Sequence, residues 1–161
     1  MKFIPQVFLE SIFLHAEREA PAECCGVILG FSGEEKFSRV RPLKNAQDEY
    51  HRQDPKNFSR TSQEAYFMDP KELLALQKEL RASEEEIRVI YHSHINAPAY
   101  FSEEDKRMAL LDGEPVYPGV DYLVISVAQG STQEACLYRW DPKEKEFLLI
   151  ETSGGFKNVP D

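Results

Sequence analysis

The chain has 161 residues, 42% of them hydrophobic, which is enough for one compact domain with a sizeable core and too little for two ordinary domains. Its formal net charge of -9 argues against general attraction to nucleic-acid backbones or anionic lipid, because both depend on clustered Lys and Arg. We therefore expect a single domain over residues 1–161, with no nucleic acid and no membrane among its partners, while the oligomeric state is left open.

Cysteine usage and the amino terminus favour a cytoplasmic location. Of the three cysteines, Cys24 and Cys25 are adjacent, which makes a poor disulfide framework and fits a reducing compartment. The first residues, MKFIPQVFLESIF, carry an early proline and a glutamate and lack the small-residue cleavage site of a signal peptide. The sequence also has no window of about 18 apolar residues that would predict a membrane span.

The first third of the chain predicts a helix followed by a β-hairpin. Apolar residues recur at helical spacing from Pro5 to Ala20, and Pro21 ends the pattern. CGVILGF (residues 25–31) is a short apolar run rich in branched side chains, which predicts a buried strand. EKFSRVRPL (35–43) predicts its partner strand across a turn at Ser32-Gly33.

A polar segment and a second helix follow. Residues 45–62 (NAQDEYHRQDPKNFSRTS) lack periodicity and contain a proline, so they predict a long loop and a candidate recognition element. Asp69 as N-cap and Pro70 at the first helical position predict a helix, with Leu73, Leu76 and Leu80 on one face. The acidic run of residues 83–86 is expected to end it.

The rest of the chain predicts four strands and one helix. IRVIYHSH (87–94) reads as a strand, and SEEDKRMALL predicts a third helix that starts at Ser102. Further strands are predicted at DYLVISV (121–127), EACLYRW (134–140) and EFLLIE (146–151). The pattern predicts an α/β (α+β) layered domain of about six strands and three helices.

The stretch YHSHINAPAYFSEED (91–105) carries the strongest chemical signal. On a strand, residues i and i+2 share a face and lie about 6.6 Å apart along the chain, so His92 and His94 can both address one metal ion. A seven-residue loop can bring Asp105, in the first turn of the next helix, to the same ion as a third ligand. Three protein ligands leave a fourth position for water, whose pKa zinc lowers to about 7, so the site would be hydrolytic.

Other interpretations of the same residues stay open at this stage. Ser102 to Asp105 has the pattern of a helix N-cap with an acid at N3, and a histidine pair on one strand face is often structural. Two histidines and a carboxylate also form the facial triad of non-haem iron oxygenases, although those enzymes are usually all-strand barrels. A zinc deaminase is a weaker alternative, because the His-x-Glu and Cys-x-x-Cys signature is missing.

The spacing His-Ser-His, seven residues, Ser, two residues, Asp resembles the signature of the JAMM (MPN-domain) zinc metalloproteases. PAECCGVILG resembles the first motif of that family, while YFMDPKELL and VYPGVDYLVISV resemble bacterial members that hydrolyse sulfur-carrier proteins. The similarity spans residues 21–127. It implies a cytidine-deaminase-like mixed central sheet. A binding scaffold that has kept the fold and lost activity is an alternative, and the intact motif argues against it.

The resemblance also implies roles for individual residues. Glu23 would be the general base, Ser102 would donate a hydrogen bond to the oxyanion, and His92, His94 and Asp105 would hold Zn²⁺. The substrate would be a ubiquitin-like or sulfur-carrier protein, cut after its carboxy-terminal Gly-Gly. The alternative is deubiquitinase-like removal of a bacterial ubiquitin-like modifier from target proteins.

Two positions depart from the bacterial pattern. Ile95 stands where a proline usually follows the second histidine, and Phe101 stands where one usually precedes the serine. Because proline fixes φ, its loss is expected to change the mobility or aim of this loop and hence the substrate fit. Cys24 and Cys25 have no evident histidine partner, so a cysteine nucleophile is disfavoured.

Overall fold

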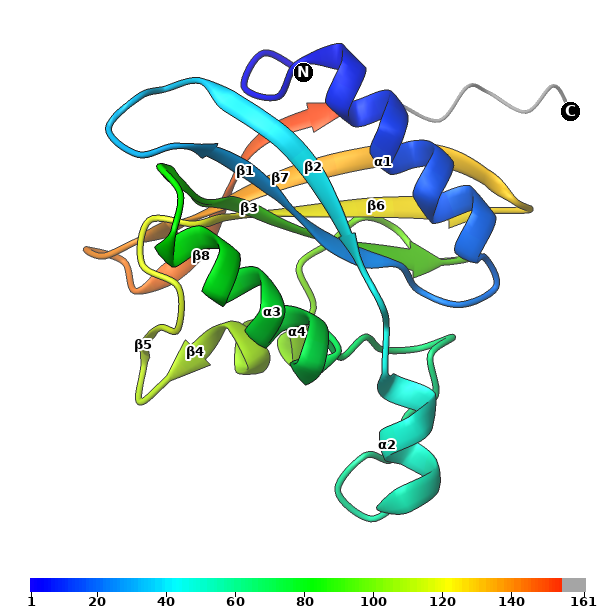
Figure 1. Cartoon of the computed structure of the whole chain (residues 1–161). Helices are drawn as coiled ribbons and strands as arrows, with labels where there is room; N and C mark the ends of the chain where they lie inside the picture. Colours follow the sequence, from blue (N-terminus) through cyan, green and yellow to red (C-terminus); the bar gives the residue numbers. More distant parts are fainter. Residues whose placement is uncertain (155–161) are drawn as a thin grey trace, which may run out of the picture.

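A computed structural model describes residues 1–154, and the last residues of the predicted domain, 155–161, lie outside the described part (Figure 1). The main sheet is built from β1 (Cys25–Phe31), β2 (Phe37–Leu43), β3 (Glu85–Ile95), β6 (Asp121–Ala128), β7 (Ser131–Asp141) and β8 (Glu146–Ser153). These strands lie in the order β2-β1-β3-β6-β7-β8. Strand β3 pairs with β6 in parallel and all other neighbours are antiparallel, so the predicted mixed sheet of six strands is confirmed.

Helices cover both faces of this sheet. Helix α1 (Gln6–Glu19) lies on one face, and α3 (Pro70–Arg81) and α4 (Glu103–Ala109) lie on the other (Figure 1). A small ribbon of β4 (Leu110–Leu111) and β5 (Glu114–Pro115) follows α4. Helix α2 (Gln47–Gln53) projects away from the sheet. Within the described residues, none of the helices combines the length and apolar character needed to cross a membrane.

Helix α2 is where the sequence prediction was wrong, because it falls inside the segment predicted as a loop. Two turns of polar residues show no apolar periodicity, so a pattern search cannot detect them. Its acidic residues Asp48 and Glu49 lie in the first turn and its basic residues in the last, which suits the helix dipole. Tyr50 packs against Phe58 and Phe67, with ring centroids 5.0 Å and 4.8 Å away, and this tertiary contact holds the helix to the following chain.

Strand β3 separates two hydrophobic cores, and its alternation decides which side chains face which core. Val89 and Tyr91 pack in the core beneath α1, while Ile90 belongs to the core beneath α3 and α4. His92 and His94 share the face of Ile90 because side chains on a strand alternate. The hydroxyl of Tyr91 shares a buried hydrogen bond of 2.9 Å with Nδ1 of His15, which ties β3 to α1.

Candidate metal centre

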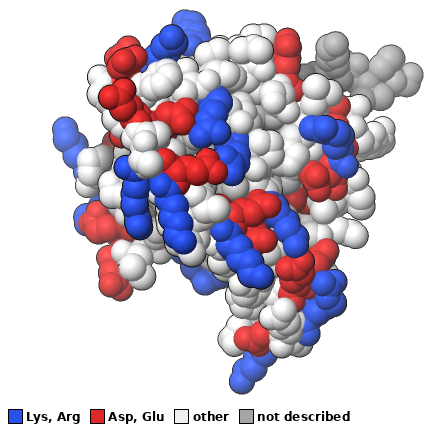
Figure 2. Space-filling model, in the orientation of Figure 1, with Lys and Arg blue, Asp and Glu red and all other residues white. Residues whose placement is uncertain are grey.

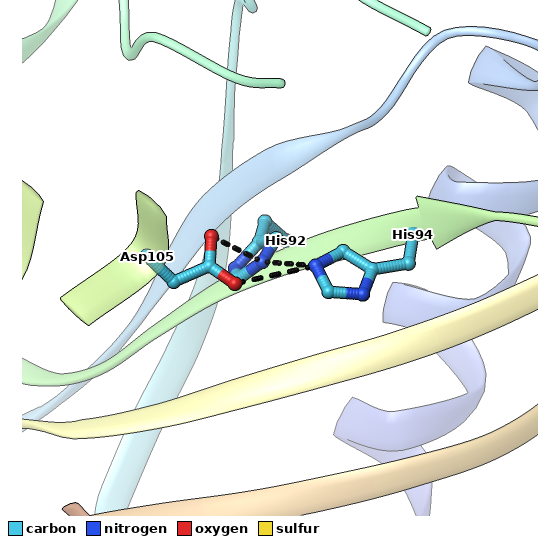
Figure 3. A group of neighbouring side chains, drawn as sticks. All are labelled: His92, His94 and Asp105. Carbon is cyan, nitrogen blue, oxygen red and sulfur yellow. Dashed lines mark hydrogen bonds and ion pairs between the residues drawn. The ribbon is translucent and has the colours of Figure 1, made fainter. Parts of the chain in front are cut away.

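Two histidines of β3 and one aspartate of α4 converge on a single point (Figure 3). Nε2 of His92 lies 3.2 Å from Nε2 of His94 and 3.1 Å from Oδ1 of Asp105. Nε2 of His94 lies 3.3 Å from Oδ2 of Asp105. All three side chains are buried. The structure therefore brings together the three residues that the sequence predicts as metal ligands.

Local structure explains how residues eleven positions apart meet. His92 and His94 share one face of β3, a strand hydrogen-bonded on both sides to β1 and β6. Ser102 is the N-cap of α4 and Asp105 is its third residue, and together they form a capping box. This box fixes the first turn of α4 so that the carboxylate of Asp105 points back at the histidines. The capping interpretation and the metal-ligand interpretation of the motif are thus compatible.

The donor set fits a divalent cation such as zinc. Four ligands placed tetrahedrally at about 2.0–2.1 Å from zinc lie about 3.3 Å from one another, which is close to the separations of the three side chains here. Nδ1 of His94 donates a hydrogen bond to the carbonyl of Pro98 at 2.9 Å, so its lone pair lies at Nε2, on the side of Asp105. Nδ1 of His92 is buried and has no hydrogen-bond partner among the described residues.

The electrostatics of the cluster favour a charged carboxylate next to at least one neutral imidazole. Burial alone would raise the pKa of Asp105, but interactions with His92, His94 and Ser102 outweigh it and lower that pKa. Burial lowers the pKa of His92 despite the opposing effect of Asp105. For His94 burial also acts to lower the pKa, yet Asp105 and the Pro98 carbonyl raise it overall. A deprotonated aspartate and a neutral histidine are the forms that bind metals.

Ser102 does two tasks with one hydroxyl group. Its Oγ donates to Oδ2 of Asp105 at 2.7 Å and accepts a hydrogen bond from the backbone N–H of Asp105 at 3.1 Å. Because a hydroxyl has a single hydrogen, it cannot donate to Asp105 and to a substrate oxygen at the same time. The serine also lines the cleft described next, so its hydroxyl can reach a bound molecule by rotation.

Glu23 lines a cleft of about 360 Å³ together with His94, Ser102 and Asp105. Its side chain is buried, and burial raises its pKa from 4.5 to about 8, with His94 opposing the shift. The backbone at Glu23 is held at both ends. Its N–H donates to the carbonyl of Ser62 at 2.7 Å, and its carbonyl accepts from the side chain of Asn45 at 2.9 Å.

The loop between the second histidine and Ser102 is held by side chains where relatives are expected to use proline. Phe101 is buried and packs on the rings of Tyr122, Tyr138 and Phe147, with centroids 4.8–5.4 Å away. The peptide groups of Ala99 are bound on both sides: Glu134 accepts from its N–H at 2.9 Å, and the hydroxyl of Tyr138 donates to its carbonyl at 2.8 Å. These contacts from β7 fix the loop without the two prolines.

Sequence reasoning missed two cleft residues. Tyr66 stacks on the ring of His92 at 4.4 Å, and Arg60 also lines the cleft. Tyr66 falls within a segment that resembles the family, and Arg60 lies in the predicted recognition segment, but neither carries a local signature. Cys24 and Cys25 are both buried and outside the cleft lining, and burial raises the pKa of the Cys24 thiol to about 12, as expected for packing residues.

Comparison with known proteins gives one family. The protein-family model described as prokaryotic homologs of the JAB domain matches residues 5–141. A CysO-cysteine peptidase of Mycobacterium tuberculosis is 28% identical over 131 residues, covering 81% of this chain and 77% of the relative. A probable TtuB-protein conjugate cleaving protease of Thermus thermophilus is 36% identical over 110 residues, covering 66% of this chain and 62% of the relative.

A solved structure supports the same fold. A protein from Desulfitobacterium hafniense, determined in solution, superposes with a TM-score of 0.65 at 26% sequence identity, covering 91% of this chain and 87% of that one. A mixed sheet with helices on both faces also differs from the all-strand barrel on which a facial-triad oxygenase is usually built.

Proposed function

Because this chain belongs to the family of prokaryotic homologs of the JAB domain, we propose that it is a zinc metallopeptidase acting on a ubiquitin-like or sulfur-carrier protein. The bond hydrolysed is the peptide or isopeptide bond after the carrier's carboxy-terminal Gly-Gly. The observation that carries this proposal is the convergence of His92, His94 and Asp105, with ligand atoms 3.1–3.3 Å apart. The names of the two relatives, a peptidase and a conjugate-cleaving protease, agree with it.

The metal site consists of His92, His94 and Asp105. A zinc ion bound there would act as a Lewis acid and lower the pKa of water at its open position to about 7. The histidines supply neutral nitrogen ligands from a strand in the middle of the sheet, and Asp105 supplies a negative charge from α4. The capping bonds from Ser102 hold that carboxylate in place.

Glu23 is the general base in this proposal. Its carboxylate takes a proton from the attacking water and afterwards delivers that proton to the departing amine. Without a bound metal ion, burial raises the pKa of this carboxyl to about 8, which favours its protonated form at neutral pH. A positive charge in the same cleft favours the carboxylate form, which is the form that can accept a proton. The base therefore becomes competent when the metal site is filled.

Ser102 stabilises the oxyanion of the tetrahedral intermediate by donating a hydrogen bond, an interaction typically worth about 3 to 4 kcal/mol of barrier. The donation requires its hydroxyl to turn away from Asp105. The backbone N–H of Ser102 also bonds Oδ2 of Asp105 at 2.9 Å, so the carboxylate keeps one hydrogen bond when the hydroxyl turns.

The Gly-Gly requirement is steric in this proposal. Two residues without side chains could thread a narrow groove and place their carbonyl at the metal site, where larger residues would clash. We also propose that the protein works as one domain in the cytoplasm, as its sequence predicts.

The test uses zinc-loaded protein and candidate carriers, each ending in Gly-Gly followed by cysteine or by a lysine-linked protein, with products identified by mass. We expect cleavage directly after Gly-Gly. Glu23→Gln should retain zinc while losing about 10²- to 10⁴-fold of the rate. Glu10→Gln, an exposed glutamate on α1, is the matched control and should keep full activity. Unchanged turnover in Glu23→Gln rejects the base, and intact carriers throughout reject the function.

A further inference from the structure

Arg60 is the one lysine or arginine among the described residues that lines the cleft around Glu23, His94 and Asp105. It also lines an adjoining hollow of about 400 Å³ that runs along Phe58 and α4, so it stands where the two spaces meet. The cleft is otherwise acidic in character. A single cation in such a position is well placed to bind an anionic group of a substrate.

The backbone of Arg60 is fixed relative to Glu23. The buried side chain of Gln47, the first residue of α2, donates a hydrogen bond to the carbonyl of Arg60 at 2.8 Å. Two residues further on, the N–H and the hydroxyl of Ser62 donate to Asp48 at 2.7 and 2.8 Å, while the carbonyl of Ser62 receives the N–H of Glu23. Helix α2 therefore fixes the backbone of Arg60 and Ser62, and through Ser62 it connects this segment to the proposed base.

The guanidinium group of Arg60 has no hydrogen-bond or ion-pair partner among residues 1–154. Five other arginines are paired with carboxylates, and Figure 2 shows basic and acidic side chains interspersed on one face of the molecule. The paired arginines are Arg39, Arg41, Arg88, Arg107 and Arg139. The charge of Arg60 acts on the cleft in a minor way. Burial raises the pKa of Glu23 and Arg60 opposes that rise, while the hydrogen bond from Arg107 lowers the pKa of Glu104 and Arg60 adds to that effect.

The proposed mechanism defines which part of a substrate lies near Arg60. Glu23 delivers a proton to the departing amine, so the leaving group must lie beside Glu23. If the leaving group is a single amino acid, its α-carboxylate is attached to the carbon next to that amine. If it is a lysine side chain of a protein, no carboxylate lies near the amine. The two substrate classes left open above therefore differ by one negative charge at this place.

We propose that Arg60 binds the free α-carboxylate of a single amino acid that is released after Gly-Gly, so that this enzyme prefers carriers extended by one residue over carriers linked to protein lysines. The inference rests on the proposed function. A guanidinium can hold a carboxylate through two parallel hydrogen bonds, a geometry that a lysine cannot reproduce.

The surrounding acids make Arg60 necessary for such a substrate. Glu64 and Glu104 line the same cleft. Glu104 is held by Arg107 at 2.6 Å, which partly neutralises it, whereas Glu64 has no such ion pair among the described residues. A substrate carboxylate would therefore meet net repulsion in the absence of Arg60, and the arginine turns this repulsion into a preference.

The experiment compares two probes that differ by one charge. Each is the same ubiquitin-like protein with a Gly-Gly tail, extended by alanine as the free acid or by alaninamide. For zinc-loaded wild type we expect kcat/KM to be about 10 to 100 times higher for the free acid. In Arg60→Gln the ratio should fall to about 1 or below, because the acids of the cleft then repel the free carboxylate, and in Arg60→Lys it should be intermediate. Effects common to both probes cancel in this ratio.

Arg52→Gln is the matched control, because Arg52 is an exposed arginine of α2 that does not line the cleft. It should leave the ratio unchanged. An acid preference that survives in Arg60→Gln, or a wild type without a preference, overturns the assignment.

A second readout separates this proposal from the proposed function. Binding of the tripeptides Gly-Gly-Ala and Gly-Gly-alaninamide to metal-free protein is followed by NMR. Tighter binding of the free acid that disappears in Arg60→Gln supports the carboxylate site even if wild type cleaves neither carrier, an outcome that counts against the proposed function instead. Equal binding of the two tripeptides to wild type counts against Arg60.

Discussion

The ring of Tyr66 lies stacked on the imidazole of His92, with centroids 4.4 Å apart and an interplanar angle of 22°. Neither residue predicts the other from sequence, since 26 positions separate them. The stack covers the one proposed ligand whose second ring nitrogen has no hydrogen-bond partner among the described residues. Packing thus takes the place of the hydrogen bond that usually orients a metal-binding histidine.

Replacing Tyr66 should test this orienting role. Tyr66→Ala removes the stack, so His92 gains freedom to rotate, and we expect zinc affinity to fall by about tenfold or more. Tyr66→Phe keeps the ring and should retain affinity within about twofold. Competition with a chromophoric chelator measures both values. Equal zinc affinity in the alanine variant and the wild type would show that β3 alone orients the imidazole.

Removing the metal should destabilise the protein. A ligand that binds only the folded state at 1,000 times its dissociation constant contributes about 4 kcal/mol, which corresponds to about 10 °C in Tm for a chain of this size. We expect a chelator to lower the Tm of zinc-loaded wild type by about this amount. Asp105→Asn should show a much smaller difference between the loaded and chelated states.

Glu103→Gln is the control for that comparison, because Glu103 is the exposed neighbour of Asp105 in the first turn of α4. Its response to the chelator should match that of wild type. The difference between loaded and chelated samples is the relevant quantity, since Asp105→Asn also weakens the capping box. A wild type whose Tm is unchanged by the chelator would contradict tight binding of a cation at this site.

The proposed ligands could be found from sequence because their geometry is local. The two-residue period of a strand places His92 and His94 on one face, and the N-cap pattern of Ser102 places Asp105 in the next turn. Glu23 was different. It lies far from this motif in the sequence, and only the family resemblance selected it among the glutamates of the chain.

What escaped prediction depends on contacts between distant segments. Tyr66 and Arg60 reach the cleft because hydrogen bonds hold the backbone near them. The side chain of Asn45 bonds the carbonyls of Glu23 and Ala65, next to Tyr66. The side chain of Gln47 in α2 bonds the carbonyl of Arg60, and the nearby carbonyl of Ser62 accepts from Glu23. Those hydrogen bonds leave no periodic trace in the sequence. The short α2 was missed for the same reason, since its stability comes from the aromatic contacts of Tyr50 rather than from an apolar stripe.

The contacts that hold Ala99 should control the loop before Ser102. Glu134→Ala leaves the buried N–H of Ala99 without its acceptor, which costs about 1–3 kcal/mol, and Tyr138→Phe removes one donor at about 1 kcal/mol. We expect faster amide hydrogen exchange in residues 96–101 of both variants. Glu144→Ala, an exposed change in the turn before β8, should leave exchange in this loop unchanged. Unaltered exchange in Glu134→Ala would mean that Phe101 packing alone fixes the loop.

The raised pKa of Glu23 has a consequence for stability that can be measured without any substrate. In the metal-free folded protein burial raises this pKa to about 8, against 4.5 for an exposed carboxyl, so between these values the folded state keeps a proton that the unfolded state releases. Stability therefore falls as the pH rises from about 4.5 to about 8, and the contribution of Glu23 at pH 7 is roughly 3 kcal/mol of destabilisation. Glu23→Gln cannot ionise at this position, so urea unfolding in the presence of a chelator should show a shallower decline of stability with pH for this variant than for wild type.

Titration of the histidines and Asp105 occurs in both proteins and largely cancels in the comparison. Zinc should reduce the wild-type decline as well, because a cation in the cleft favours the carboxylate and brings its folded pKa back toward 4.5. Parallel pH profiles for wild type and Glu23→Gln would show that Glu23 is already ionised in the metal-free cleft, and the link between filling the metal site and switching on the base would then be lost.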